Sequence, residues 1–459
     1  MSLATELTTS LGRSVSNTLK GSAGNLVEWY DVYVYSTFAA YFESQFFDTR
    51  DKNSTIYVWA IFAVTFVMRP IGSWFFGRFA DRYGRRAALT FSVSLMAACS
   101  FVVAIIPTRV VFGAGAVAVL LLARLVQGFA TGGEYGTSAT YMSEAAVPGR
   151  RGFLSSFQYV TLVGGQVVAQ LVLLIMLLTM SPDAISAWGW RVAFGIGGVA
   201  ALVVLWIRRT MDETLHTETI AAVRSGEGEA ARTHGSLVEL FGRWWREALL
   251  VFLITAGGTL AFYVYSVNAP AQIQKAFAGS SPVAAGWINL GSLAILMVLQ
   301  PIGGWLSDIV GRKSLLVFFG VGGALYTWFL VTQLPKQTSA GAAFGILVVG
   351  FVILTGYTSI NAVVKAQSFP MHIRALGLGI AYAVANSLFG GTAPLLYQAA
   401  AARNSVSAFI VYATVVILVS LVVYVFFLRN TGANWLDDPD EMQRRADARR
   451  RKVRAPGAV

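Results

Sequence analysis

The sequence is poor in the residues that build metal centres and hydrolytic sites. Of its 459 residues only Cys99 is a cysteine, which excludes an intrachain disulfide and leaves no cysteine-based metal site to expect. The three histidines, His216, His234 and His372, lie outside the apolar runs. A hydrolase needs a nucleophile paired with a base, and no histidine is placed to serve as that base. We therefore expect no metal, no cofactor and no enzymatic activity.

Charge is also scarce. Charged residues make up 13% of the chain, against about 25% in soluble domains, whereas 56% of the residues are hydrophobic and the mean hydropathy is +0.61. The longest polar interruption, 208–246, is too short for a soluble domain. Apolar stretches of about 18 residues or more recur along the chain, which predicts an all-α, polytopic membrane protein. The N-terminal segment lacks a cleavable small-residue site, so we expect the first span to be retained.

Twelve apolar spans are predicted, and the basic residues are distributed unevenly between the segments that join them. The proposed inner segments hold 24 Lys and Arg residues, the outer segments seven. By the positive-inside rule both termini are cytoplasmic. The net charge of +12 is therefore attributed to the basic cytoplasmic segments that set the topology in the membrane, and not to nucleic-acid binding. The spans are 22–47, 55–80, 87–107, 113–143, 153–180, 191–207, 247–268, 283–306, 314–334, 341–366, 375–401 and 405–428.

The chain divides into two halves of six spans. We predict an N-terminal half over 22–207 and a C-terminal half over 247–428, joined by the cytoplasmic linker 208–246 and flanked by the tails 1–21 and 429–459. The stretch "GRFADRYGRR" in the first half recurs as "GWLSDIVGRK" in the second. Parallel six-helix repeats are a transporter architecture. The basic stretch "RRADARRRKVR" of the C-terminal tail is interpreted as orientation charge and lipid headgroup contact rather than as a surface for a specific partner.

Ionisable residues inside the spans are predicted to share one level of the membrane. Glu28 and Asp31 lie on one face of the first span. Counting about 1.5 Å per residue from the inner ends places Asp31 and Arg69 roughly 16–18 Å deep, and Arg124 falls at a similar level. Charges at that depth must pair or face an aqueous cavity. Two interpretations stay open: an ion pair such as Asp31 to Arg69 that joins helices, or a proton-carrying carboxylate beside an anion-binding arginine.

On the second interpretation the residues take distinct roles. An anion at the arginine favours protonation of the nearby carboxylate, so substrate and proton bind with positive coupling. Asp31 is the expected proton carrier, with Glu28 as the alternative. Arg69 and Arg124 can hold the two ends of a dicarboxylate, and Lys365 either snorkels to the surface or forms a cytoplasmic-side substrate contact. Further cavity-lining candidates among the polar and aromatic residues of the spans are Tyr35, Gln127, Gln158 and Asn361.

The repeated loop motif resembles a family signature and predicts a gate between the two halves. The pattern G-x-x-x-D-x-x-G-R-[RK], together with "ARLVQGFATGG", resembles the signature sequences of the major facilitator superfamily, and "GNLVEWYD" and "GGEYGTSATYMSE" resemble its metabolite:proton symporter family. Asp81 ends a helix, where the helix dipole disfavours a carboxylate; the resemblance implies that it latches onto a helix N-terminus of the opposite half. Arg85 is expected to reach Glu144. The candidate gate residues are Gly77, Asp81, Gly84, Arg85, Arg86, Glu144, Asp308, Gly311 and Arg312.

The resemblance implies a proton-coupled symporter that imports 2-oxoglutarate or a related dicarboxylate by alternating access. The Arg-rich, Lys-poor composition and the lack of a signal predict a bacterial inner-membrane location. We expect a monomer in the lipid bilayer, with a small anionic metabolite and the proton as partners. Another organic acid (shikimate, an aromatic acid or citrate) or an osmolyte is the alternative substrate within the family. A non-transporting membrane sensor is the alternative from another class. The absence of a nucleotide-binding loop argues against direct ATP-driven transport.

Overall fold

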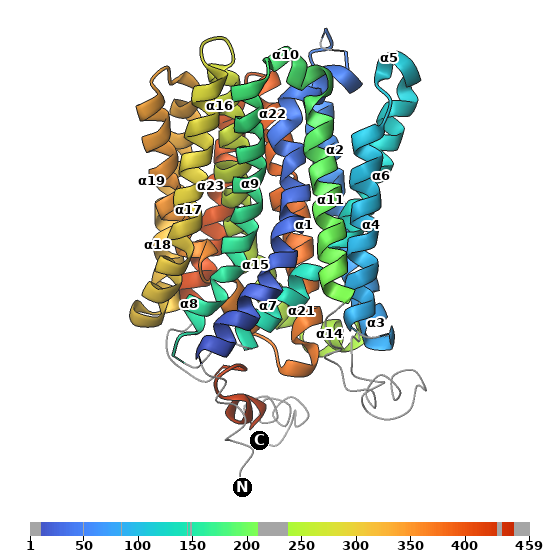
Figure 1. Ribbon diagram of the computed structural model, residues 1–459. Coiled ribbons are helices and arrows are strands. Elements are labelled where there is room, and N and C mark those ends of the chain that lie inside the picture. Colours follow the sequence, from blue (N-terminus) through green and yellow to red (C-terminus); the bar gives the residue numbers. More distant parts are fainter. Residues whose placement is uncertain are drawn as a thin grey trace.

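The computed structural model describes residues 11–48, 50–83, 85–144, 146, 149–209, 237–428 and 434–444. Within these ranges every regular element is a helix, and the long helices run side by side as one bundle (Figure 1). Ten of the described helical segments are long and apolar enough to cross a membrane. The all-helical, multi-pass architecture is thereby confirmed, and the count of twelve spans stays a prediction.

Two predicted spans are not among those ten. The first span corresponds to α1 (Leu11–Phe46), which carries the buried acids Glu28 and Asp31. The third corresponds to α4 (Arg85–Ile105), whose apolar part is confined to Thr90–Ile105. The second span is α2 (Ser54–Val67) with α3 (Arg69–Tyr83), and the fourth is α6 (Ala114–Gly132) with α7 (Glu134–Glu144). The fifth span is α8 (Arg151–Ser155) with α9 (Phe157–Thr179), and the sixth is α11 (Trp190–Arg209). Short outer pieces are α5 (Arg109–Phe112), α10 (Pro182–Ala184) and the π-helix η1 (Ile185–Gly189).

The second half begins after the short helix α14 (Leu237–Arg243). Two of its described spans are interrupted by π-helical turns, η2 (Val264–Asn268) and η4 (Asn386–Gly391), and such turns are frequent at functional sites. Its elements are α15 (Trp245–Tyr263), η2 and α16 (Ala269–Phe277); α17 (Pro282–Val310); α18 (Arg312–Gln333) and η3 (Leu334–Lys336); α19 (Ala340–Thr358) and α20 (Asn361–Ala366); α21 (Met371–Ala385), η4 and α22 (Ala393–Ala402); and α23 (Val406–Phe426).

The second span is broken at Met68, and the sequence gives the reason. Pro70 has no backbone N–H and so cannot donate to the carbonyl of Phe66, four residues earlier. The hydroxyl of Ser387, on η4 of the other half, donates to that carbonyl instead. The break places Arg69 at the first position of α3, and it ties the two halves together beside that residue.

The second and fourth spans touch backbone to backbone. A Cβ atom on Gly128 would lie 1.8 Å from the carbonyl oxygen of Thr65, and one on Gly72 would lie 2.0 Å from that of Phe129. Only glycine permits such an approach, and small residues at helix crossings are typical of membrane bundles. This close packing brings the helices that carry Arg69 and Arg124 together.

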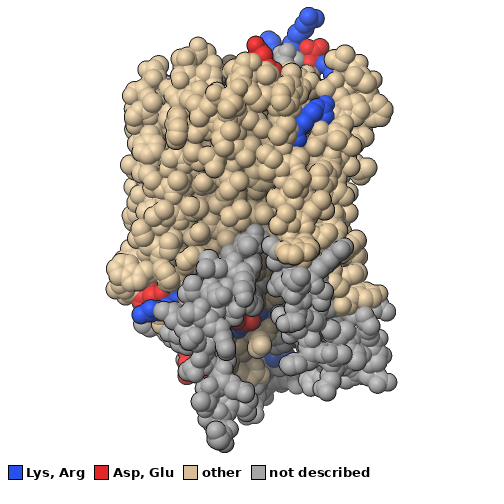
Figure 2. Space-filling view, viewed as in Figure 1, with Lys and Arg blue, Asp and Glu red and all other residues tan. Residues whose placement is uncertain are grey.

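The halves meet along two seams. Helix α21 packs against α7 and α3, and α17 packs against α8 and α9. On the face shown in Figure 2, the visible charged side chains gather near the two ends and leave an uncharged belt between them. Large apolar side chains are exposed on the described helices, among them Trp206, Leu325 and Phe426. Such a belt is what contact with hydrocarbon requires.

Candidate functional site

Asp31 is the centre of a buried polar network inside the first half. Its side chain is 3% exposed. One carboxylate oxygen accepts a hydrogen bond from the Ser100 hydroxyl on α4, and the other accepts from Nε2 of Gln127 on α6 at 2.6 Å. Nη1 of Arg124 donates to Oε1 of Gln127 at 2.7 Å. Gln127 therefore links the carboxylate to the guanidinium, and Asp31 contacts neither Arg124 nor any other cation within 4.0 Å among the described side chains.

The ion pair between Asp31 and Arg69, one of the two interpretations that the sequence leaves open, is not formed among the described side chains. Arg69 is 3% exposed, and its guanidinium carbon lies 3.9 Å from the ring centre of Phe66 and 5.4 Å from that of Trp29. Its Nε and Nη2 atoms have no hydrogen-bond partner. The interpretation of this pair as a structural staple is therefore wrong, because the rotation of α1 and the break before α3 point the two groups at different neighbours.

A narrow cavity lies in front of Arg69 and is formed by both halves. Its lining includes Glu28 from α1, Arg69 from α3, Tyr135 from α7 and Tyr382 from α21. A second small cavity, between α1, α4 and α11, is lined by both Glu28 and Asp31. Glu28 thus borders both cavities, whereas Arg69 lines only the first and Asp31 only the second.

Arg124 is 1% exposed, and its Nε and Nη2 atoms have no hydrogen-bond partner. Its guanidinium carbon lies 4.5 Å from the ring centre of Tyr35, a favourable cation–π distance. The Tyr35 hydroxyl donates to the carbonyl of Val58 on α2 at 2.8 Å. That hydroxyl is therefore engaged by the backbone, and Tyr35 supports Arg124 with its ring.

Gln158 and Asn361 each keep one unsatisfied polar atom. Gln158 accepts from the Ser138 hydroxyl at 2.8 Å, and its Nε2 has no partner. Asn361 Nδ2, on α20, donates to the hydroxyls of Tyr135 at 3.1 Å and Tyr159 at 2.7 Å, both in the first half, and its Oδ1 has no partner. Buried polar atoms without a hydrogen-bond partner are rare in folded proteins. The free atoms of Gln158 and Asn361 are therefore available to bind a ligand.

Lys365 does not snorkel. It is 0% exposed, and Nζ has no hydrogen-bond or ion-pair partner. The physical reason is the direction of α20, which runs toward the end of the bundle that holds Gln367 and Trp435; side chains of a helix tilt toward its N-terminus, away from that end. The ammonium lies among tyrosine rings, with centroid distances of 4.3 Å to Tyr382 and 5.5 Å to Tyr135.

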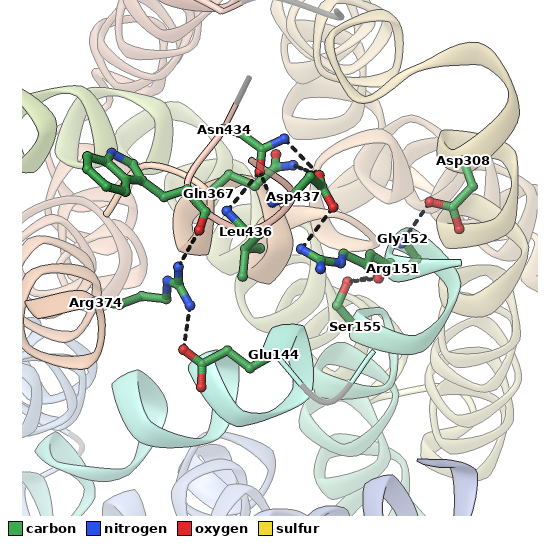
Figure 3. Close-up of polar contacts among 11 residues, drawn as sticks. Glu144, Arg151, Gly152, Ser155, Asp308, Gln367, Arg374, Asn434, Leu436 and Asp437 are labelled. Atoms are coloured by element: carbon green, nitrogen blue, oxygen red, sulfur yellow. Dashed lines mark hydrogen bonds and ion pairs between the residues drawn. The ribbon is translucent and has the colours of Figure 1, made fainter. Parts of the chain in front are cut away.

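The second copy of the loop motif closes one end of the bundle. The carboxylate of Asp308 accepts from the backbone N–H of Gly152 at 2.8 Å (Figure 3). It also accepts from the backbone N–H of Phe153 at 3.0 Å, and both N–H groups lie at the N-terminus of α8 in the opposite half. Gly311, with φ +87°, makes the turn that follows, and Arg312 begins α18. A carboxylate on free N–H groups of a helix N-terminus is a favourable contact. It joins the halves, as expected for the motif.

The first copy is described only in part. Gly77 lies in α3, where a Cβ atom would be 4.0 Å from Leu376 Cδ1 of the other half. Asp81 lies in the last turn of α3, and Arg85 and Arg86 begin α4, but the side chains of these three residues lie outside the description, as does Gly84. The described partner of Glu144 is Arg374 of the second half, with which it forms an ion pair; the expected contact with Arg85 stays a prediction.

A segment that sequence reasoning missed packs across this gate. We name Asn434–Arg444 the C-terminal strap. Asp437 forms an ion pair with Arg151 of α8 at 3.0 Å, and the Trp435 carbonyl accepts from Nη2 of Arg374 at 2.9 Å (Figure 3). Trp435 is 6% exposed and packs edge-on against Trp244. The prediction of orientation charge and lipid contact concerns the basic stretch 444–454, which apart from Arg444 lies outside the described residues. The sequence signal for the strap was a tryptophan and two aspartates, "NWLDD", within a basic tail.

The sequence model of the "Sugar (and other) transporter" family matches residues 18–435. The chain belongs to this family of the major facilitator superfamily. It is a membrane transporter and not an enzyme. It is 42% identical to the alpha-ketoglutarate permease of Escherichia coli (strain K12), over 88% of this chain and 91% of that protein. It is 29% identical to the citrate-proton symporter of Klebsiella pneumoniae, over 86% and 87% respectively.

The solved structures establish the fold of the transporter. The major facilitator proton:xylose symporter bound to 6-bromo-6-deoxy-D-glucose superposes with a TM-score of 0.73 at 19% sequence identity, covering 92% of this chain and 98% of that chain. The inward open xylose transporter of E. coli superposes with a TM-score of 0.65 at 20% identity, covering 94% and 99% respectively.

Proposed function

We propose that the transporter is a proton-coupled symporter that imports 2-oxoglutarate or a related dicarboxylate across the bacterial inner membrane by alternating access. The proposal includes twelve spans in two halves of six, cytoplasmic termini and a monomer surrounded by lipid. The observation that carries it is the buried network of Asp31, Gln127 and Arg124, next to a cavity with the unpaired Arg69 and lined by both halves. The relatives named as a ketoglutarate permease and a citrate-proton symporter support the substrate class.

The geometry supports a specific coupling mechanism. Arg124 lies one amide away from Asp31, so its positive charge favours the ionised carboxylate without neutralising it directly. An anionic substrate that binds the free guanidinium atoms of Arg69 or Arg124 offsets this charge. Protonation of Asp31 then becomes easier when substrate is present, which is positive coupling between the two ligands.

Glu28 gives the proton a route between the two sites. It lines the cavity that contains Arg69 and the cavity that contains Asp31. Asp31 itself is held by Ser100 and Gln127, away from the Arg69 cavity. We assign the stored proton to Asp31 and the transfer of protons toward it to Glu28.

The remaining site assignments are part of the same proposal. Gln127 positions Arg124, and the ring of Tyr35 supports it, while Gln158 and Asn361 offer their unsatisfied amide atoms to substrate. The gate comprises both motif copies, from Gly77 to Arg86 and from Asp308 to Arg312, together with Glu144.

The test is uptake into proteoliposomes with an imposed pH gradient. Labelled 2-oxoglutarate competes against citrate, shikimate, an aromatic acid, proline and betaine. We expect accumulation that depends on an acidic exterior and is abolished by a protonophore, with 2-oxoglutarate as the best competitor. Preference for citrate favours the alternative organic acid, and preference for betaine the osmolyte. Tight binding of any compound without flux contradicts the proposal and favours a sensor.

A further inference from the structure

Lys365 differs from every other described charged residue of the second half. It is fully buried and its Nζ has no hydrogen-bond or ion-pair partner, whereas the buried Arg374 is paired with Glu144. The Lys365 ammonium lies beside Tyr135, nine residues along α7 from Glu144, which corresponds to about 13 Å from the gate. It is therefore the one described charge that the second half contributes to the interior of the bundle.

The surroundings of Lys365 do not compensate its charge. Tyr135 and Tyr382 stack with their ring centres 3.5 Å apart and an interplanar angle of 13°. Nζ lies 5.5 Å from the ring centre of Tyr135 and 4.3 Å from that of Tyr382, and these cation–π contacts supply neither a counter-ion nor a hydrogen bond. A fully buried ammonium without counter-ion or hydrogen bond is costly, so the position calls for an anion.

The same tyrosine stack borders the cavity of Arg69. Tyr135 and Tyr382 both line that cavity, and they belong to opposite halves. Asn361, one turn before Lys365, adds an unpartnered Oδ1 and bonds to the Tyr135 hydroxyl. The unpaired guanidinium of Arg69 thus lines the cavity that these two rings border, and the unpaired ammonium of Lys365 lies by the same two rings.

We propose that Lys365 is a second carboxylate anchor, so that a dicarboxylate bound at one end by Arg69 of the first half is bound at the other by Lys365 of the second. The inference rests on the proposed organic-acid symport and deepens it. The Tyr135–Tyr382 stack separates to admit the substrate chain. A substrate held only by first-half arginines favours no particular arrangement of the halves, whereas one held by both cations favours their approach. A monocarboxylate leaves one cation unpaired, and the site therefore discriminates by the number of carboxylates.

The test compares 2-oxoglutarate with 2-oxopentanoate, which has the same carbon chain but a single carboxylate. In proteoliposomes we expect the wild type to prefer the dicarboxylate in competition, and Lys365→Met to lose about tenfold or more of that preference, because a hydrogen-bonded ion pair with substrate is removed. The affinity for 2-oxopentanoate should stay within about twofold. Lys365→Arg should retain most of the preference. Lys275→Met, an exposed lysine at the end of α16, is the matched control and should behave as wild type.

Thermal stabilisation of the purified protein by each acid provides a second measurement that needs no flux, and Lys365→Gln replaces Lys365→Met if the latter does not fold. The two failures are distinguishable. A wild type that takes up neither acid overturns the proposed symport. A wild type that takes up 2-oxoglutarate while Lys365→Met and Lys365→Gln keep the full preference overturns the anchor alone.

Discussion

At the scale of single residues, the proposed transport site contains more positive charge than it neutralises. Arg69, Arg124 and Lys365 are all buried and all retain unsatisfied donor atoms. A folded core without function would pair such groups or exclude them, because an unpaired buried charge is expensive. These unpaired cations destabilise the protein without substrate, as expected for a site that is completed by a ligand anion. When the anion binds, the free energy gained by pairing them favours the closed arrangement of the two halves.

The first prediction concerns Asp31. Asp31→Asn keeps the size of the side chain and can still form hydrogen bonds, but it has no carboxyl group to take up a proton. We therefore expect exchange of substrate across the membrane to continue. Accumulation driven by a pH gradient should stop once the substrate concentrations on the two sides are equal. Counterflow and uptake under an imposed pH gradient measure the two activities separately. Asp183→Asn, in the short outer helix α10, is the control. Uphill uptake by Asp31→Asn at the wild-type rate would remove Asp31 from the coupling step.

The residues of the site differ in how far the sequence can predict them. Glu28, Asp31, Arg69, Arg124 and Lys365 are visible at once because a charge is conspicuous in an apolar run. Their partners are not. Ser100 resembles any serine of a membrane helix, and nothing in the sequence places its hydroxyl on Asp31. Pairing depends on helix rotation, which is set by tertiary contacts, whereas the break at Met68 follows from Pro70.

At the scale of helices, glycine contacts determine where the arginines lie. Gly128 and Thr65 bring the fourth and second spans to van der Waals contact, where a single added methyl group has no space. The sequence predicts such contacts in general, since glycines are frequent in the spans, but it does not tell which glycine faces a neighbouring helix.

The second prediction tests this packing. Gly128→Ala should lower the thermal midpoint of the purified protein by several degrees, because overpacking a helix contact costs about 1–3 kcal/mol, and it should also reduce transport by displacing Arg124. Gly195→Ala is the matched control, since a Cβ atom there meets nothing within 4 Å. In that variant the better helix propensity of alanine predicts an unchanged or slightly raised midpoint. Equal shifts in the two variants, measured by differential scanning fluorimetry, would show that the contact is not decisive.

The third prediction concerns the C-terminal strap. Asp437→Asn removes the ion pair with Arg151, whereas Asp438→Asn changes an exposed neighbour of the same charge. The pair is partly exposed, so its loss is worth up to about 1 kcal/mol, or roughly fivefold in the open population. In a Cys99→Ala background, a cysteine at Thr140 should therefore react up to about fivefold faster with a cytoplasmic thiol reagent in Asp437→Asn, and at the original rate in Asp438→Asn. Identical rates in both would limit the strap to a packing role.

At the scale of the whole molecule, both ends of the bundle are tied across the halves. At the motif end Asp308 binds the N-terminus of α8 and Arg374 pairs with Glu144. Toward the other end Nε2 of Gln274, on α16, donates to the Thr37 carbonyl of α1 at 3.2 Å, and Gln166 donates to Ser266. Alternating access requires that these two sets of contacts open in turn, so weakening one set must shift the population toward opening at that end.

The fourth prediction uses this reciprocity. Asp308→Asn weakens two charge-assisted hydrogen bonds at the motif end, and a loss of about 1.5–3 kcal/mol corresponds to a shift of roughly ten- to a hundredfold in the ratio of the two open states. A cysteine at Thr140 should then label faster from the cytoplasm, and a cysteine at Thr37 should label more slowly from outside. Faster labelling at both positions would indicate general loosening of the fold instead of alternating access. Added 2-oxoglutarate should slow both reactions, because a substrate that binds to both halves stabilises the arrangement in which neither end is open.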